Sequence, residues 1–151
     1  MQMVTIYKID KIAYLLHGNQ KTKSGITIAS EPFIKVATDE TGLVEIAEAI
    51  SKYIEGNINR QVEDIKDWGA FNKEFLQKTK LTSSKVLGNL STKCLEVSKI
   101  GTTYLFTPTY HDPNDSLGYI GKGNGFQISL STSASIAELV ENIIEGFNKC
   151  N

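Results

Sequence analysis

Two histidines and two cysteines are the side chains of this chain that suggest covalent chemistry: His17, His111, Cys94 and Cys150. A cysteine thiolate is a nucleophile and a histidine can move its proton. His111 lies beside Asp112, which suggests the base and the orienting acid of a hydrolase. Neighbouring residues seldom adopt that geometry, however, and the apolar residues around Cys94 predict a strand that buries its thiol. We therefore expect His111 to be a loop histidine, and a small hydrolase that uses His111 and Cys94 is kept as an alternative.

Two pairs of glutamates lie three residues apart, Glu45 with Glu48 and Glu138 with Glu141. Such pairs resemble half of a carboxylate site for two metal ions only when histidines accompany them, and none does. The sequence also lacks the Cys-x-x-Cys, His-x-x-x-His and Asp-rich calcium-loop patterns. We expect no metal site, no cofactor and no catalytic residue, with the glutamates on solvated helix faces.

Alternating glycines at Gly121, Gly123 and Gly125 suggest a phosphate cradle at first sight. A cradle of this kind opens a helix whose amides meet the anion. Here the glycines lead into Phe126 to Leu130, which are typical of a strand. The pattern therefore predicts a glycine-rich hairpin turn.

The composition favours a single globular domain that spans residues 1–151. The hydrophobic share is 40% and the charged share is 22%, which is typical of a globular chain. The net charge is -1 and Arg60 is the only arginine. A nucleic-acid reader normally carries a basic, arginine-rich face, so direct binding of nucleic acid is not expected. A mildly acidic surface suits a basic protein partner better.

No stretch approaches the roughly 18 uninterrupted apolar residues of a membrane helix. The first ten residues alternate apolar and polar side chains and lack the features of a signal peptide. We therefore expect a cytoplasmic protein with no membrane partner and with two reduced thiols.

Strand patterns dominate both ends of the chain. Met3 to Leu16 predicts one long strand or two short ones, which the polar run Gly18 to Gly25 ends. Ile26 to Ala37 predicts strand residues in which Pro32 marks an edge position, a bulge or a break. In the second half, the predicted strands are Lys93 to Val97, Thr103 to Thr107, a short one from Tyr119, and Phe126 to Leu130, with a turn at Ile100 to Thr102 and an exposed loop from Thr109 to Leu117.

Helix patterns occur in three places. One stripe runs from Leu43 to Ile54, after Asp39-Glu40-Thr41-Gly42, where Asp39 or Thr41 can cap the helix, and Gly56 and Asn57 close it. A second stripe begins near Asp67, and its Trp68 is expected to anchor the core. A third follows Ser135, which forms a capping box with Glu138. Thr82 to Leu90 predicts a short helix or an irregular segment.

The first and third helices belong to a sequence unit that occurs twice in the chain, 93 residues apart. Each unit is an aromatic-led strand, a polar turn and an amphipathic helix, from Phe33 to Ile54 and from Phe126 to Phe147. We therefore predict an α+β fold with a largely antiparallel sheet of five to seven strands and two to four packed helices. The two similar strand-to-helix units are expected to lie adjacent, with their apolar stripes against the sheet.

The order of these pieces resembles the immunity proteins of bacterial contact-dependent growth inhibition, the CdiI type. The resemblance runs from about Leu43 to Cys150. Its carriers are Leu43 to Tyr53, Ser84-Lys85-Val86, Lys93 to Val97, Phe106-Thr107-Pro108 and Ile136 through Cys150, whereas Val86 to Leu90 departs from the regular aromatic segment of relatives.

The resemblance implies a non-catalytic cytoplasmic protein whose partner is a cognate CdiA C-terminal toxin domain, expected to be a nuclease. Binding would block the active site of the toxin or its access to substrate. Carboxylates would speed encounter with a basic groove, so we expect toxin contacts at Asp39, Glu40, Tyr110, Asp112 and Asp115. A ligand-binding regulatory domain with a pocket between sheet and helices remains a further alternative.

Overall fold

The computed structural model describes residues 2–55 and 61–151. Its elements in chain order are β1 (Gln2–Ile9), β2 (Ala13–Lys21), β3 (Thr27–Val36), α1 (Glu40–Tyr53), α2 (Trp68–Thr79), the 3-10 helix η1 (Ser84–Gly88), β4 (Lys93–Ile100), β5 (Thr103–His111), β6 (Tyr119–Gly121), the 3-10 helix η2 (Asn124–Phe126), β7 (Ile128–Ser131) and α3 (Ile136–Asn148).

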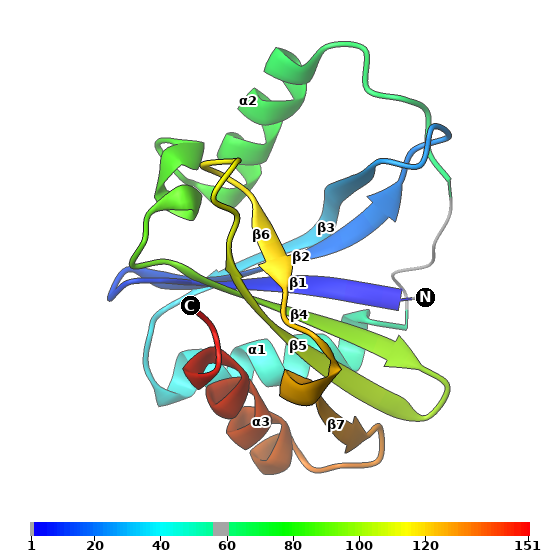
Figure 1. Cartoon of the computed structure of the whole chain (residues 1–151), viewed down its shortest axis with the longest axis vertical. Helices are drawn as coiled ribbons and strands as arrows, with labels where there is room; N and C mark the ends of the chain where they lie inside the picture. Colours follow the sequence, from blue (N-terminus) through cyan, green and yellow to red (C-terminus); the bar gives the residue numbers. More distant parts are fainter. Residues whose placement is uncertain (1, 56–60) are drawn as a thin grey trace.

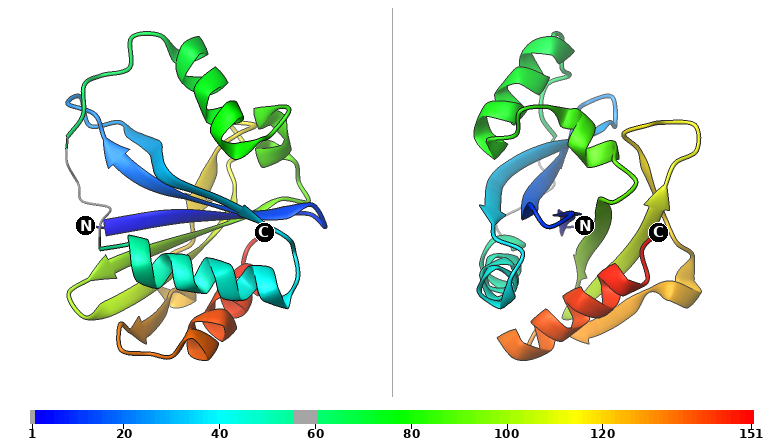
Figure 2. Two further views of the ribbon diagram at one scale, coloured as in Figure 1. Left: turned by 180° about the vertical axis from the view of Figure 1, so that it is seen from behind. Right: turned by 90° about the vertical axis from the view of Figure 1, so that its left-hand side faces the viewer.

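Within the described residues, seven strands form an antiparallel sheet in the order β3-β2-β1-β4-β5-β6, and β7 also pairs with β5 (Figure 1). Helices α1 and α3 lie side by side beneath the sheet, while α2 and η1 lie above it (Figures 1 and 2). We call these two sides the lower face and the upper face. This architecture confirms the predicted α+β class with its antiparallel sheet and packed helices.

The hydrophobic core lies between the lower face and the helices α1 and α3. Alternate residues of the central strands point into it, because successive side chains of a strand face opposite ways. Its members are fully or nearly buried and include Val4, Ile6, Leu16, Ile46, Ile50, Ile54, Leu95, Val97, Phe106, Leu139, Ile143 and Phe147. A smaller cluster on the upper face joins Ile9, Leu15 and Leu87.

The repeated sequence unit survives in its helices and diverges in its strands. The apolar stripes of α1 and α3 are buried against each other and the sheet, as predicted. The strands that precede them do not lie together. Strand β3 is at one edge of the sheet, whereas β7 pairs with β5 toward the opposite edge. Phe33 faces Phe75 above the sheet at 5.8 Å between ring centroids, whereas Phe126 lies in η2 and is 49% exposed.

Asp39 and Ser135 cap α1 and α3 as predicted, and Asp67 caps α2, which was not predicted. The side-chain oxygens of Asp39 and Asp67 accept hydrogen bonds from backbone amides at 2.8 and 3.0 Å. Ser135 and Glu138 form the capping box, with the Glu138 amide 3.2 Å from the serine hydroxyl. The expected end of the first helix at Gly56 and Asn57 lies outside the described residues.

Two strands run further than their sequence indicates. Strand β2 continues to Lys21, so the polar run from Gly18 does not end it, because its polar side chains find partners on the upper face. The Asn19 amide, for example, donates to the Thr5 hydroxyl at 3.0 Å. Strand β5 continues through Pro108 to His111, where it pairs with β6. The predicted exposed loop from Thr109 to Leu117 is therefore too long and begins only after His111.

Three other predictions concern single residues or turns. Pro32 lies on the edge strand β3 beside a register shift opposite His17 and Gly18, which confirms the edge and bulge reading. The glycines from Gly121 do not form a hairpin turn, because β6 and β7 both pair with β5 rather than with each other. Trp68 does not anchor the core, since it starts the peripheral helix α2 and is 50% exposed.

We expect α2 to open more readily than α1 or α3. Thr79 is the buried residue of α2, whereas six residues of α1 and four of α3 are buried. Segments with few buried contacts exchange their amides through low-energy local openings. Hydrogen–deuterium exchange with mass spectrometry should show faster exchange across α2 than across α1 and α3. Equal protection of the three helices would contradict this expectation.

No helix within ranges 2–55 and 61–151 combines the length and the apolar character that crossing a bilayer requires.

Candidate functional site

The candidate site is a hollow of about 320 Å³ on the upper face, which α2 covers only in part. We call it the upper pocket. Strands β1, β2 and β4 supply its floor, α2 one wall, and the turn before β6 another. The polar and aromatic residues that matter for its chemistry are Thr5, Tyr7, His17, Asn19, Phe71, Phe75, Glu96 and Tyr119.

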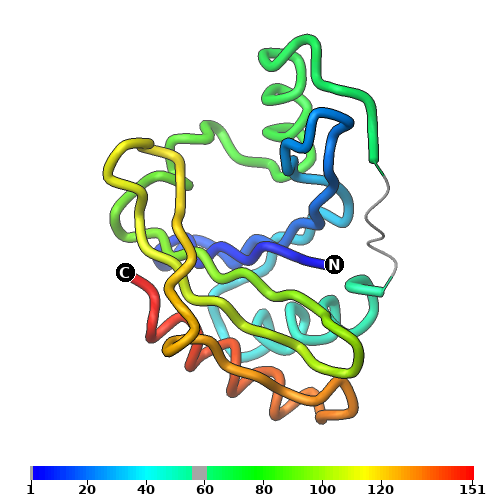
Figure 3. The backbone as a smooth tube through the Cα atoms, turned by 45° about the vertical axis from the view of Figure 1, so that its right-hand side comes forward, coloured from blue at the N-terminus to red at the C-terminus, as the bar shows by residue number. Residues whose placement is uncertain are grey.

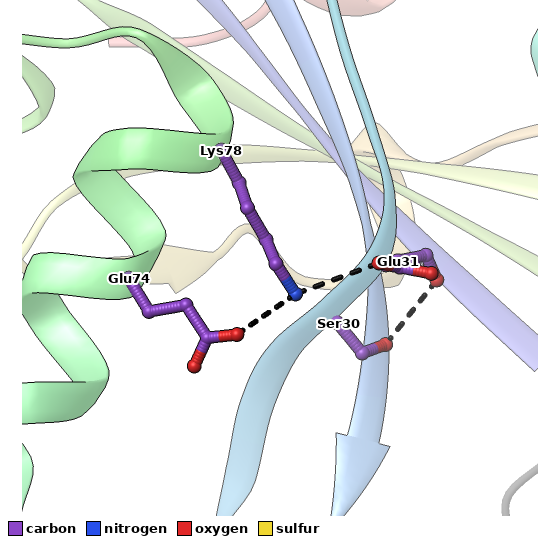
Figure 4. A network of polar contacts seen from close by, with 4 residues as sticks. All are labelled: Ser30, Glu31, Glu74 and Lys78. Atoms are coloured by element: carbon purple, nitrogen blue, oxygen red, sulfur yellow. Dashed lines mark hydrogen bonds and ion pairs between the residues drawn. The ribbon is translucent and has the colours of Figure 1, made fainter.

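Helix α2 is attached to the edge strand β3 by polar and aromatic contacts. The Lys78 ammonium lies 3.1 Å from the Glu74 carboxylate and 3.5 Å from that of Glu31, and Figure 4 shows it reaching across to β3. The Phe33 ring lies under the same ammonium at 5.6 Å and against Phe75. Exposed ion pairs stabilise little, so the aromatic contacts position this wall of the pocket.

His17 is a buried, neutral hydrogen-bond acceptor in the pocket floor. Its Nδ1 lies 2.7 Å from the Gly18 carbonyl oxygen, which can only accept, so Nδ1 carries the proton. Burial lowers the pKa of His17 to about 4, which leaves the ring uncharged at neutral pH. Its Nε2 therefore has a free lone pair. The ring is flanked by those of Tyr7 and Phe75, with centroids 5.8 and 6.1 Å away.

Glu96 and Tyr7 bring two further polar groups to the same floor. Among the described residues, neither the Glu96 carboxylate nor the Tyr7 hydroxyl has a hydrogen-bond or ion-pair partner. Burial raises the pKa of Glu96 above its ordinary value, and burial with the nearby Cys94 and Tyr119 raises the pKa of Tyr7. A half-buried carboxylate without a cation is costly in the isolated protein, so it marks a place where a partner can add stability.

The turn over residues 112–118 forms the far side of the pocket and rests against η1. Figure 3 shows the backbone of this turn beside that of η1. Gly88 allows this approach, because a Cβ there would lie 2.0 Å from the Ser116 carbonyl oxygen. The Tyr119 hydroxyl donates to the Leu87 carbonyl, and the His111 Nε2 lies 2.8 Å from the Thr92 carbonyl oxygen. These contacts fix the turn relative to the sheet.

The geometry around Cys94 does not suit a nucleophile. Cys94 is 3% exposed, and burial raises the pKa of its thiol well above the ordinary value. The reactive thiolate is therefore scarcely populated at neutral pH. His111 is the last residue of β5 rather than a loop residue, and its ring packs on Tyr119 with centroids 4.6 Å apart. Both cysteines are free and buried.

The five residues expected to contact a toxin fall into two groups. Asp39 and Glu40 begin α1 on the lower side of the sheet. Asp112 and Asp115 shape the turn beside the upper pocket, where their carboxylates accept from the amides of Asn114 at 2.8 Å and Leu117 at 3.0 Å. Tyr110 lies on β5 and is 36% exposed. The proposed contact set stays a prediction, and no single patch defined here contains all five.

Sequence reasoning named His17 only as one of two histidines that suggest chemistry, and it missed the pocket residues Tyr7, Asn19 and Glu96. Their signal is nevertheless present, since polar residues alternate with buried apolar ones along three strands. A strand with one face in the core and the other toward a polar site has this pattern. Without strand order, however, the pattern cannot be told from ordinary exposure to water.

Comparisons with known proteins define the fold class of the chain. The sequence matches no family model and no curated protein sequence. Its fold is similar to that of a protein of unknown function from Neisseria meningitidis, with a TM-score of 0.75 and 7% identity over 99% of this chain and 95% of that one. It is also similar to a chain of the CdiA-CT/CdiI toxin and immunity complex from Yersinia pseudotuberculosis, with a TM-score of 0.70 and 10% identity over 99% and 97% of the two chains.

Proposed function

We propose that this chain is an immunity protein of the CdiI type, which binds a cognate CdiA C-terminal toxin domain in the cytoplasm and neutralises it without catalysis. The observation that carries this proposal is the similarity of fold, over nearly the full length of both chains, to a chain of a toxin and immunity complex. The sequence resemblance described above points to the same class.

The expected toxin is a nuclease whose active site or substrate access the immunity protein blocks. Nucleases present basic grooves to their substrates, and a complementary carboxylate surface speeds association. The exposed acids Asp39, Glu40 and Asp115 fit that role. Tyr110 and Asp112 complete the expected contact set. Buried aromatic contacts would supply most of the affinity.

The upper pocket favours one alternative, a small-molecule-binding regulatory domain. Its volume of about 320 Å³ lies at the low end of the roughly 300–1,000 Å³ typical of ligand sites. Native mass spectrometry of the protein purified from its host would reveal a retained small molecule. The hydrolase alternative has less support, because Cys94 is a buried thiol of raised pKa.

A binding titration tests the proposed function. We expect a cognate toxin gene immediately upstream, and its C-terminal toxin domain should bind this protein with a Kd of about 1 μM or tighter in calorimetry. A toxin domain from an unrelated system serves as the control and should give no heat of binding. Absence of binding to the upstream toxin domain would remove the proposal.

A further inference from the structure

We infer that the upper pocket receives an arginine side chain of the protein partner, with Glu96 as its counter-ion and the ring of Tyr7 as a stacking surface. This inference rests on the proposed function, because it assigns a contact within the same complex. None of the residues that line the pocket belongs to the expected contact set, although Asp112 and Asp115 lie on the turn beside it.

The first argument is charge. Glu96 lines the pocket, and no lysine or arginine does among the described residues. The carboxylate has no partner within that part of the chain. A cation that enters the pocket therefore meets an unpaired negative charge in a partly desolvated place, where attraction is stronger than in water.

The second argument is hydrogen bonding. The neutral His17 ring uses its Nδ1 proton on the Gly18 carbonyl and leaves Nε2 as an acceptor. The Asn19 amide nitrogen donates to the Thr5 hydroxyl and to the Met3 carbonyl, which leaves its side-chain oxygen as an acceptor. A floor with surplus acceptors suits a ligand that only donates, and the arginine guanidinium has five N–H donors and no acceptor.

The third argument selects arginine over lysine. The rings of Tyr7, His17, Phe75 and Tyr119 line the pocket. A planar guanidinium stacks on aromatic rings, is more weakly hydrated than an ammonium and forms two parallel hydrogen bonds with a carboxylate. The volume of about 320 Å³ leaves room for one such side chain.

The pocket can be tested without the toxin, by titrating N-acetyl-arginine methylamide into the isotope-labelled full chain and following its NMR spectrum. We expect shifts at Thr5, Tyr7 and Glu96, and affinity at least fivefold weaker for Glu96→Gln. The matched control Glu141→Gln removes an exposed carboxylate on α3 and should bind the probe like the parent chain. Glutamine has nearly the same shape as glutamate, and the substitution leaves no other group without its hydrogen bond, so the fold should persist.

The neutral isostere N-acetyl-citrulline methylamide separates charge from shape on the unaltered chain. It should cause at most a small fraction of the shifts at the pocket. Equal binding of the arginine and citrulline probes, or unchanged binding of the arginine probe to Glu96→Gln, would overturn the inference.

The cognate toxin domain then places the pocket in the complex. Glu96→Gln should weaken that complex at least tenfold, while Glu141→Gln leaves it unchanged. Equal toxin binding by both variants would overturn the inference and leave the proposed function standing. If the toxin domain fails to bind the parent chain, the proposed function falls, and with it the assignment of the arginine to a toxin.

Discussion

Replacing Phe106 with alanine is expected to lower the free energy of unfolding by about 3–5 kcal/mol, the range seen when a large buried aromatic residue is truncated. Phe106 is 0% exposed and lies on the lower face of β5, between its cross-strand neighbours Val97 and Ile128. Helices α1 and α3 close the same cluster from below. The cavity would therefore open where sheet and both helices meet, and the rigid surroundings could not collapse to fill it.

Urea denaturation of both chains measures this effect. Leu105→Ala is the matched control, because Leu105 is the preceding residue, points to the other face and is only half-buried. It should cost less than about 1.5 kcal/mol. Similar losses for the two variants would contradict the assignment of the core to the lower face.

His17 should make the protein less stable in mild acid. Its pKa is about 4 in the folded chain, below the ordinary 6.5 expected when unfolded. As the pH falls below about 6.5, His17 becomes protonated in the unfolded chain. In the folded chain it stays neutral until about pH 4. The free energy of unfolding therefore decreases with falling pH across this window, by about 3 kcal/mol in total.

The variant His17→Phe keeps an aromatic ring between Tyr7 and Phe75 but removes the titrating group. Carboxylates titrate in both proteins, so the informative quantity is the difference between their stability profiles. Between pH 7 and pH 4.5, the parent chain should lose about 2 kcal/mol more than the variant in urea denaturation. Parallel profiles would show that His17 is accessible to protons in the folded chain.

Much of the fold is predictable because its signals are local. The capping box at Ser135, the cap at Asp39 and the apolar stripes of α1 and α3 each depend on residues within a few positions of one another. Pro32 likewise indicates an edge strand, because proline has no amide proton to donate to a neighbouring strand. The structure confirms all of these.

The failures share another cause, which is dependence on distant partners. Strand β2 continues through Asn19 because Thr5 satisfies the amide, and β5 reaches His111 because β6 pairs with it. Trp68 has a large apolar side chain that is typical of a core residue, yet it lies on the peripheral helix α2 and is half exposed. The floor of the upper pocket comes from strands far apart in the sequence, since β2 ends at Lys21 and β4 begins at Lys93, so no short window of sequence contains it.

Side chains along β1 and β4 alternate between the lower core and the upper pocket, so each strand contributes to both. Val4, Ile6 and Leu95 point toward α1 and α3, while Tyr7 and Glu96 point toward the pocket. A substitution at Glu96 therefore changes the pocket without removing a side chain from the core on the lower face. Under the proposed function, the partner that this scaffold recognises could change through such positions, one residue at a time, while the lower core stays intact.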